Sequence, residues 1–299
     1  MHIRSKLIAP VMMAIGVTMA AAAEDGAGDR KFDEGLSQFE AGRVSEAMSS
    51  FREACLMGPD AGSQMFSCNA WLDYLQDGTT GLRVEPASAK TQPDIPAYEK
   101  AADEACKQGK YASACFRRAE EIDQATGAPS EEYIAAGCDA GSATTCSVLA
   151  RYRYTGSFGE RDLPGAFEAH GKACELGEQD NCLTAARMLA LGAGVTKDLD
   201  MAVSAAQMAC PNDKPTDPQL CIDAADFILE YGDDSPRDVR NMVMMLQRSC
   251  MFPTAEGCAW YAEELEFMAE DDPAASQELL DMAAEARRKA CTYGDADSC

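Results

Sequence analysis

The arrangement of the cysteines constrains the fold of this chain more than any other feature. The 299-residue chain has 14 cysteines, which fall into seven close pairs. First members of successive pairs are 51, 32, 36, 36, 40 and 41 residues apart. An interval of this size with small insertions is typical of stacked helical hairpins. The seven pairs are Cys55 and Cys68, Cys106 and Cys115, Cys138 and Cys146, Cys174 and Cys182, Cys210 and Cys221, Cys250 and Cys258, and Cys291 and Cys299.

The segments between the pairs have the pattern of two helices joined by a glycine-rich turn. After Cys182, the residues Leu183, Ala186 and Leu189 recur at the spacing of one helical face, and glycines follow at 192 and 194. In the next segment these residues recur at helical spacing: Met201, Ala202, Ala205 and Met208. Aromatic residues make up only 7% of the chain, and runs rich in Val, Ile and Thr are missing. The sequence therefore predicts an all-α solenoid of about seven helix-turn-helix repeats.

Two of these units resemble the Sel1-like repeat, whose pattern runs G-x-G-V-x-x-D-x-x-K-A and continues into a helix that ends in K-A-A and a glycine. Cys174 and Cys210 stand at the second Ala of K-A-A, as in the cysteine-rich bacterial members of this family, and Met201 replaces the usual Lys. The matching residues are Gly192, Gly194, Val195, Asp198 and Ala202 in one unit, and Gly156, Asp162, Ala166, Lys172, Ala173 and Gly177 in the preceding one.

The first unit is more similar to a tetratricopeptide repeat. The residues that carry this similarity are Gly35, Leu36, Phe39, Gly42, Ala47 and Phe51. The two related patterns together imply a helical repeat domain over most of residues 32–299.

The N-terminus predicts export. Arg4 and Lys6 precede an apolar run over 7–19 and small residues over 20–23, which is the order of a secretory signal peptide. We therefore expect a signal peptide at 1–23, a repeat domain at 24–299, and a periplasmic or secreted protein. No cysteine lies near residue 23, so a lipoprotein anchor is not expected. No later apolar run is long enough for membrane insertion.

An exported chain with an even number of cysteines favours disulfides over metal ligation. The short loop between antiparallel helices brings the two members of each pair close together, so we predict seven sequential disulfides stapling the repeats. Structural zinc sites use closer C-x2-4-C pairs, often with histidine. None occurs here, and the only histidines are His2 and His170.

The chain is strongly acidic. Its formal net charge is −24, and loss of Arg4 and Lys6 with the signal peptide gives 24 − 50 = −26. This charge repels the phosphates of nucleic acids and favours a soluble monomer. One segment departs from the repeat pattern: residues 78–96 are rich in Pro, Gly, Ser and Thr, which predicts a loop insertion.

No catalytic, cofactor-binding or metal-binding residue is predicted. The resemblance to cysteine-rich Sel1-like proteins implies one alternative function, a cell-wall-active enzyme that binds or hydrolyses β-lactams or peptidoglycan fragments. Serine β-lactamases use S-x-x-K, K-T-G and S-D-N motifs, and this chain has none of them. His170 is interpreted as a helix-packing or surface residue.

The repeat architecture favours a scaffold that binds a protein partner, or a cell-wall fragment, on a solenoid surface. Aromatic residues are the candidate contacts if they are exposed. They are Trp71, Tyr74, Tyr152, Tyr154, Trp260 and Tyr261.

Overall fold

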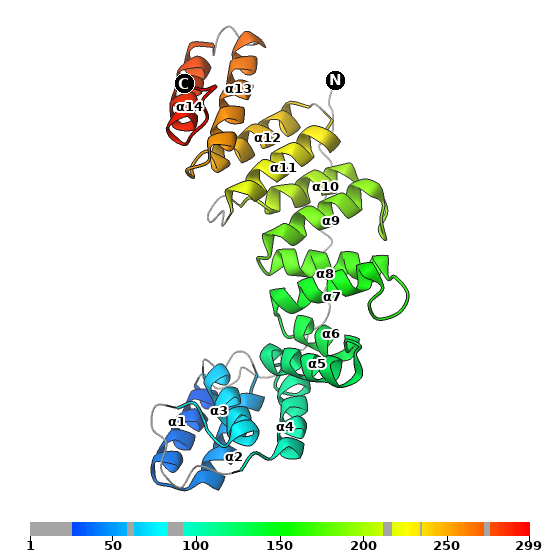
Figure 1. Ribbon diagram of the computed structural model, residues 1–299, viewed down its shortest axis with the longest axis vertical. Helices are drawn as coiled ribbons and strands as arrows, with labels where there is room; N and C mark the ends of the chain where they lie inside the picture. Colours follow the sequence, from blue (N-terminus) through cyan, green and yellow to red (C-terminus); the bar gives the residue numbers. More distant parts are fainter. Residues whose placement is uncertain (1–25, 59–62, 83–91, 212–216, 234, 272–275) are drawn as a thin grey trace, which may run out of the picture.

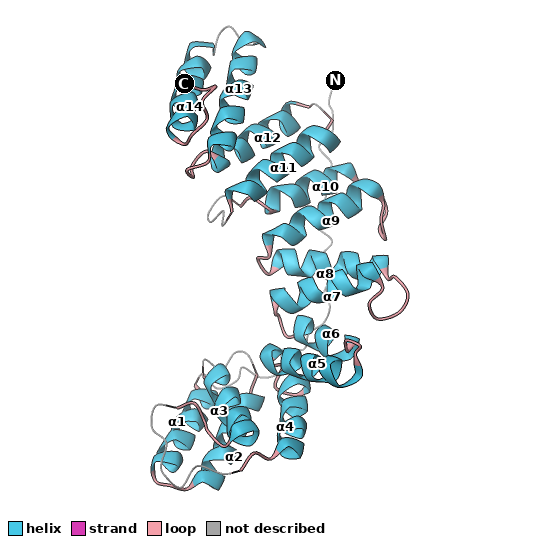
Figure 2. Ribbon diagram, in the orientation of Figure 1, coloured by secondary structure: helices cyan, strands magenta, loops and turns pink. Residues whose placement is uncertain are grey.

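The described part of the chain folds into fourteen α-helices. The computed structural model describes residues 26–58, 63–82, 92–211, 217–233, 235–271 and 276–299, and no strand occurs in these ranges (Figure 2). The helices are α1 (Ala27–Glu40), α2 (Val44–Leu56), α3 (Gln64–Asp77), α4 (Ile95–Lys107), α5 (Ala112–Thr126), α6 (Glu131–Asp139), α7 (Ala143–Thr155), α8 (Leu163–Glu175), α9 (Gln179–Leu191), α10 (Leu199–Met208), α11 (Pro218–Tyr231), α12 (Pro236–Ser249), α13 (Ala255–Asp271) and α14 (Ser276–Thr292).

Consecutive helices pair into seven hairpins, from α1–α2 to α13–α14. Each odd-numbered helix is the first helix of its hairpin and each even-numbered helix is the second. The hairpins follow one another in chain order along an elongated molecule (Figure 1). The predicted all-α solenoid of seven helix-turn-helix repeats is confirmed.

Glycine ends four of the first helices. The C-terminal cap of each is a glycine with φ between 70° and 79°, a left-handed conformation that costs a residue with a Cβ atom more than it costs glycine. These caps are Gly78, Gly127, Gly156 and Gly192.

Side-chain caps begin four of the second helices. In each, a carboxylate or hydroxyl oxygen accepts a hydrogen bond from a backbone N–H of the first turn, which would otherwise lack a partner. These capping residues are Asp94, Asp162, Asp198 and Ser235.

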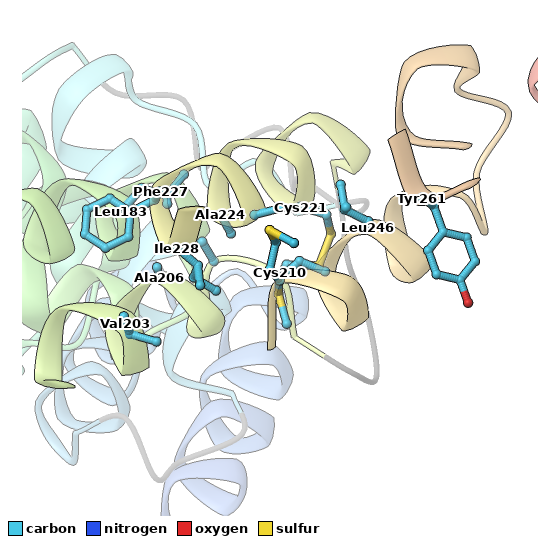
Figure 3. Close-up of a cluster of buried hydrophobic side chains, with 14 of the residues drawn as sticks. Leu183, Val203, Ala206, Cys210, Cys221, Ala224, Phe227, Ile228, Leu246 and Tyr261 are labelled. Carbon is cyan, nitrogen blue, oxygen red and sulfur yellow. A yellow bond between two sulfur atoms is a disulfide. The ribbon is translucent and has the colours of Figure 1, made fainter. Parts of the chain in front are cut away.

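The core is built mainly of small residues. In α9, eight of thirteen residues are buried, and only Asp180, Arg187 and Leu191 are exposed. Helix α9 is therefore covered on most sides by its neighbours. The buried residues form two clusters, one over α1–α8 and one over α8–α14, which meet along α8. Figure 3 shows the second cluster around the Cys210–Cys221 disulfide.

The packing face of helix α10 differs from the one that the helical spacing of Met201 and Met208 predicted. Met201 and Met208 are exposed, while Ala202, Val203 and Ala206 are buried. The small residues let α10 approach its neighbours closely, so the long methionine side chains remain on the outside.

The insertion predicted at 78–96 lies between α3 and α4, except that Ile95 and Pro96 already begin α4. Its residues 83–91 are outside the described ranges. Its end is fixed, because the Asp94 N–H donates to the carbonyl of Leu75 at 2.9 Å. The predicted signal peptide at 1–23 also lies outside the described residues. None of the described helices is both long enough and apolar enough to cross a membrane.

Candidate protein-interaction surface

The disulfides join one hairpin to the next. Six of the seven connect the end of a second helix to the beginning of the following first helix, and the Cys291–Cys299 bond joins α14 to the residues after it. Their Cα–Cα distances are 4.5 to 5.0 Å. The described part of the chain has no free cysteine, so its thiols are used in structure.

His170 belongs to a buried polar network that joins three helices. Its Nδ1 donates to Oδ1 of Asn181 in α9 at 2.7 Å, and Nδ2 of Asn181 donates to Oγ of Ser147 in α7 at 3.1 Å. Burial lowers the pKa of His170, although the hydrogen bond to Asn181 opposes that shift. Because the serine contacts the asparagine and not the imidazole, this network lacks the nucleophile–base contact that catalysis needs.

A second network joins α4, α5 and α6. Arg118 donates to Asp103 at 2.8 Å and to Glu121 at 2.5 Å, and the Tyr133 hydroxyl donates to Asp103 at 2.8 Å. Burial is the main cause that raises the pKa of Tyr133, with a further contribution from Asp103. Because each donor in this network has a carboxylate acceptor on its own or a neighbouring helix, the network holds the three helices together.

The described surface has hollows of different sizes. A wide, shallow one of about 670 Å³ opens to solvent where α1 turns into α2, with Arg43, Glu46, Met48 and Tyr74 among its lining residues. A pocket of about 200 Å³ lies between α12, α13 and α14, with Tyr261, Met282, Glu285 and Lys289 among its lining residues. Glu285 and Lys289 form an ion pair at 3.1 Å. Small-molecule sites usually have about 300–1,000 Å³, so this pocket is the size of one side chain. Among the described residues, no group of three His, Cys, Asp or Glu side chains could hold a metal ion.

Exposed apolar residues occur on four successive first helices. Near the end of each stands one large apolar side chain, and together these four form what we call the apolar row: Tyr154 on α7 (44% exposed), Leu191 on α9 (67%), Leu229 on α11 (55%) and Phe267 on α13 (62%). Single exposed apolar residues are common on protein surfaces, but here one recurs in each of four successive repeats, eight or nine residues after the cysteine of the same helix.

The apolar row has defined limits. The corresponding positions of the two preceding first helices are polar, with Gln76 and Asp77 on α3 and Asp123 and Gln124 on α5. The row therefore extends over the four hairpins from α7 to α14.

Of the six aromatic residues predicted as candidate contacts, only one belongs to the apolar row. Trp71 and Tyr261 are buried, and Tyr74, Tyr152 and Trp260 are half-buried. Tyr154 is the one that lies in the apolar row. Sequence reasoning missed Leu191, Leu229 and Phe267, since an apolar residue in a helix is normally assigned to the core.

These features define a class of protein: a disulfide-stapled α-helical repeat scaffold. No protein-family model and no curated protein sequence matches the chain. Among solved structures, c5321, a protective antigen of uropathogenic Escherichia coli displaying an SLR fold, matches with a TM-score of 0.52 and 18% identity. The match covers 92% of this chain but 56% of that protein, so the chain spans about half its length.

Two further solved structures match more weakly. A Sel1 repeat protein from Oxalobacter formigenes has a TM-score of 0.43 and 18% identity, over 85% of this chain and 99% of that one. The Helicobacter pylori cysteine-rich protein B has a TM-score of 0.30 and 26% identity, over 42% of this chain and 89% of that one. The match to c5321, the one of the three with a TM-score above 0.5, shows that the chain has the SLR (Sel1-like repeat) fold, and the resemblance found in its sequence is confirmed at this level.

Proposed function

We propose that this protein is an exported scaffold that binds a partner protein along the apolar row. The observation that carries the proposal is the exposure of one large apolar side chain on each of α7, α9, α11 and α13. A rigid stack of hairpins presents such residues at regular intervals, which suits an extended segment of another polypeptide.

Site-specific photo-crosslinking in the native host tests this function. A photoreactive amino acid at position 191 or 267 is expected to crosslink one partner, because both side chains lie on the apolar row. Matched controls at Met208 on α10 and Leu280 on α14, which are also exposed but on second helices, are expected to give no adduct with that partner.

The captured partner is then purified and its affinity is measured directly. The double substitution Leu191→Ser and Phe267→Ser should weaken binding at least tenfold, since a few apolar contacts carry most of the energy of an interface. Equal crosslinking from all four positions, or none from 191 and 267, would contradict the proposed surface.

Export is supported by the basic and apolar N-terminal sequence together with seven disulfides. We propose that cleavage after Ala23 releases a soluble monomer into the periplasm or the medium. N-terminal sequencing of protein from these fractions should begin at Glu24, and light scattering should give the mass of one chain. A protein recovered only from the cytoplasm would contradict export.

A further inference from the structure

The first helices that carry the apolar row differ in charge along the molecule. Helix α7 contains Arg151 and Arg153 and no acidic residue, and α9 contains one arginine and one aspartate. Helix α11 has three acidic residues and α13 has six, and neither contains a lysine or an arginine. The formal charge of these helices therefore changes from +2 through 0 and −3 to −6 along the stack (Figure 1).

This change in charge reaches the apolar row itself. One helical turn before each apolar residue stands an exposed charged residue, three or four positions earlier in sequence, so both lie on the same side of the helix. The four pairs are Arg151 with Tyr154, Arg187 with Leu191, Asp226 with Leu229, and Glu263 with Phe267.

Other charges on these helices are neutralised within the protein and do not alter this order. Arg153 donates to Glu131 at 2.8 Å, and Glu266 forms an ion pair with Arg287 at 2.6 Å. Exposed Glu230, Glu256 and Glu270 add to the negative charge of α11 and α13.

We propose that the apolar row binds an extended polypeptide segment with segregated charges, acidic where it crosses α7 and α9 and basic where it crosses α11 and α13. This inference rests on the proposed function and adds to it the chemistry and the direction of the partner. Apolar side chains between the two charged ends contact the row. Complementary charges then fix the orientation and accelerate association.

The length of the segment follows from the packing of the helices. Packed helices lie about 8–10 Å apart, and the path from α7 to α13 crosses six helix–helix packings, from α7–α8 to α12–α13, so the four first helices span at most about 50–60 Å. An extended chain covers about 3.3 Å per residue, and a segment of at most roughly 15–18 residues therefore reaches from Arg151 to Glu263.

Synthetic peptides test the inference with the full mature, oxidised protein. One set of peptides has two aspartates at one end, four lysines at the other, and leucine and phenylalanine between them. The comparison set has the same composition with the charges mixed along the sequence. We expect the segregated set to bind about tenfold more tightly at low salt, and this preference to shrink at high salt.

Substitutions locate the effect. Arg151→Glu with Arg187→Glu should remove most of the preference for segregated charge. The matched control, Arg240→Glu with Arg288→Glu, makes the same change at exposed positions of α12 and α14 and should leave the preference intact. Circular dichroism verifies that both variants are folded.

Equal binding of the two peptide sets, no binding of either set, or equal loss in both variants would overturn the inference. The proposed scaffold function is tested by a different experiment, so the two can fail independently. If crosslinking at 191 and 267 identifies a partner while the peptide sets bind equally, the scaffold function stands and only the charge-segregated ligand is wrong.

Discussion

At the scale of single residues, small side chains decide how closely the helices approach one another. Gly35 of α1 lies against the ring of Phe51 in α2, and a Cβ atom placed on Gly35 would be 2.6 Å from that ring. Gly171 of α8 has no such neighbour within 4 Å. These two helical glycines therefore have different structural roles.

The substitution Gly35→Ala is expected to destabilise the first hairpin by about 1–3 kcal/mol, because the added methyl group overpacks the contact with Phe51. Gly171→Ala serves as the control and should stabilise the protein by up to about 1 kcal/mol through helix propensity. Urea unfolding and hydrogen exchange of α1 and α2 measure the difference. An unchanged α1–α2 hairpin in Gly35→Ala would contradict the close contact.

His170 predicts a dependence of stability on pH. The pKa of His170 is lowered from 6.5 in the folded protein, mainly by burial, so the unfolded chain takes up a proton first as the pH falls. The contribution of neutral His170 is complete above about pH 6.5 and declines as the pH approaches its folded pKa.

Hydrogen exchange of α8 and α9 between pH 7.5 and 5.5 should show this decline in the native protein. The variant His170→Gln cannot titrate there and should lose less stability over the same range. Identical pH profiles for the two proteins would show that His170 is not the group responsible.

At the scale of the helices, the disulfides stabilise the joints between hairpins, by which we mean the contacts between the second helix of one hairpin and the first helix of the next. Each hairpin contacts only the hairpins next to it in the stack. Loss of the packing between two adjacent hairpins therefore separates the molecule into two parts. A disulfide at each joint closes a short loop, which in the chain-entropy model stabilises the folded state by roughly 2–3 kcal/mol. The stapling disulfides therefore protect the places where a repeat protein separates most easily.

Peptide mapping of the unreduced protein should recover disulfides between sequential cysteines only. This pairing follows from the short separation of the cysteines in the stack, with Cα–Cα distances of 4.5 to 5.0 Å. Mass spectrometry of proteolytic fragments makes the measurement, with a fully reduced sample as control. A crossed disulfide between different pairs would contradict the stapled hairpins.

The position of a disulfide determines the effect of its removal. Replacing Cys174 and Cys182 by alanine opens the joint between α8 and α9, where the two core clusters meet, and should cost about 2–3 kcal/mol. Replacing Cys291 and Cys299 should only increase exchange in residues 293–299, because this disulfide joins α14 to that short segment and not to another hairpin. Comparable losses in both double variants would contradict this distinction.

At the scale of the whole molecule, excess negative charge opposes the compact state. The net charge of −24 is distributed unevenly, since α11 and α13 contain no basic residue. The ion pairs of Arg118 and Arg287 offset part of the repulsion locally. Repulsion over longer distances remains and is sensitive to salt.

Raising NaCl from 10 to 150 mM should therefore raise the thermal midpoint, because ions screen this repulsion more than they weaken the few close pairs. Calorimetry of the oxidised protein makes the measurement. Sucrose at equal osmolality is the control, since it has no charge. A falling midpoint would mean that the ion pairs outweigh the repulsion.

The sequence alone determined the class of fold and the number of repeats. The spacing of the cysteines, the glycines that end the first helices and the capping residues that begin the second act over a few residues, so they are visible without coordinates. Helix α6, the second helix of the third unit, is the shortest of the described helices, with nine residues.

Only the tertiary structure decided which side of each helix faces solvent. Apolar spacing indicated packing for Met201 and Met208, which are exposed, and could not distinguish Leu191 or Phe267 from core residues. A first helix is covered by its own partner and by adjacent hairpins at once, so burial depends on neighbours that are distant in sequence. The apolar row exists because one side of each of α7, α9, α11 and α13 is left uncovered by their neighbours.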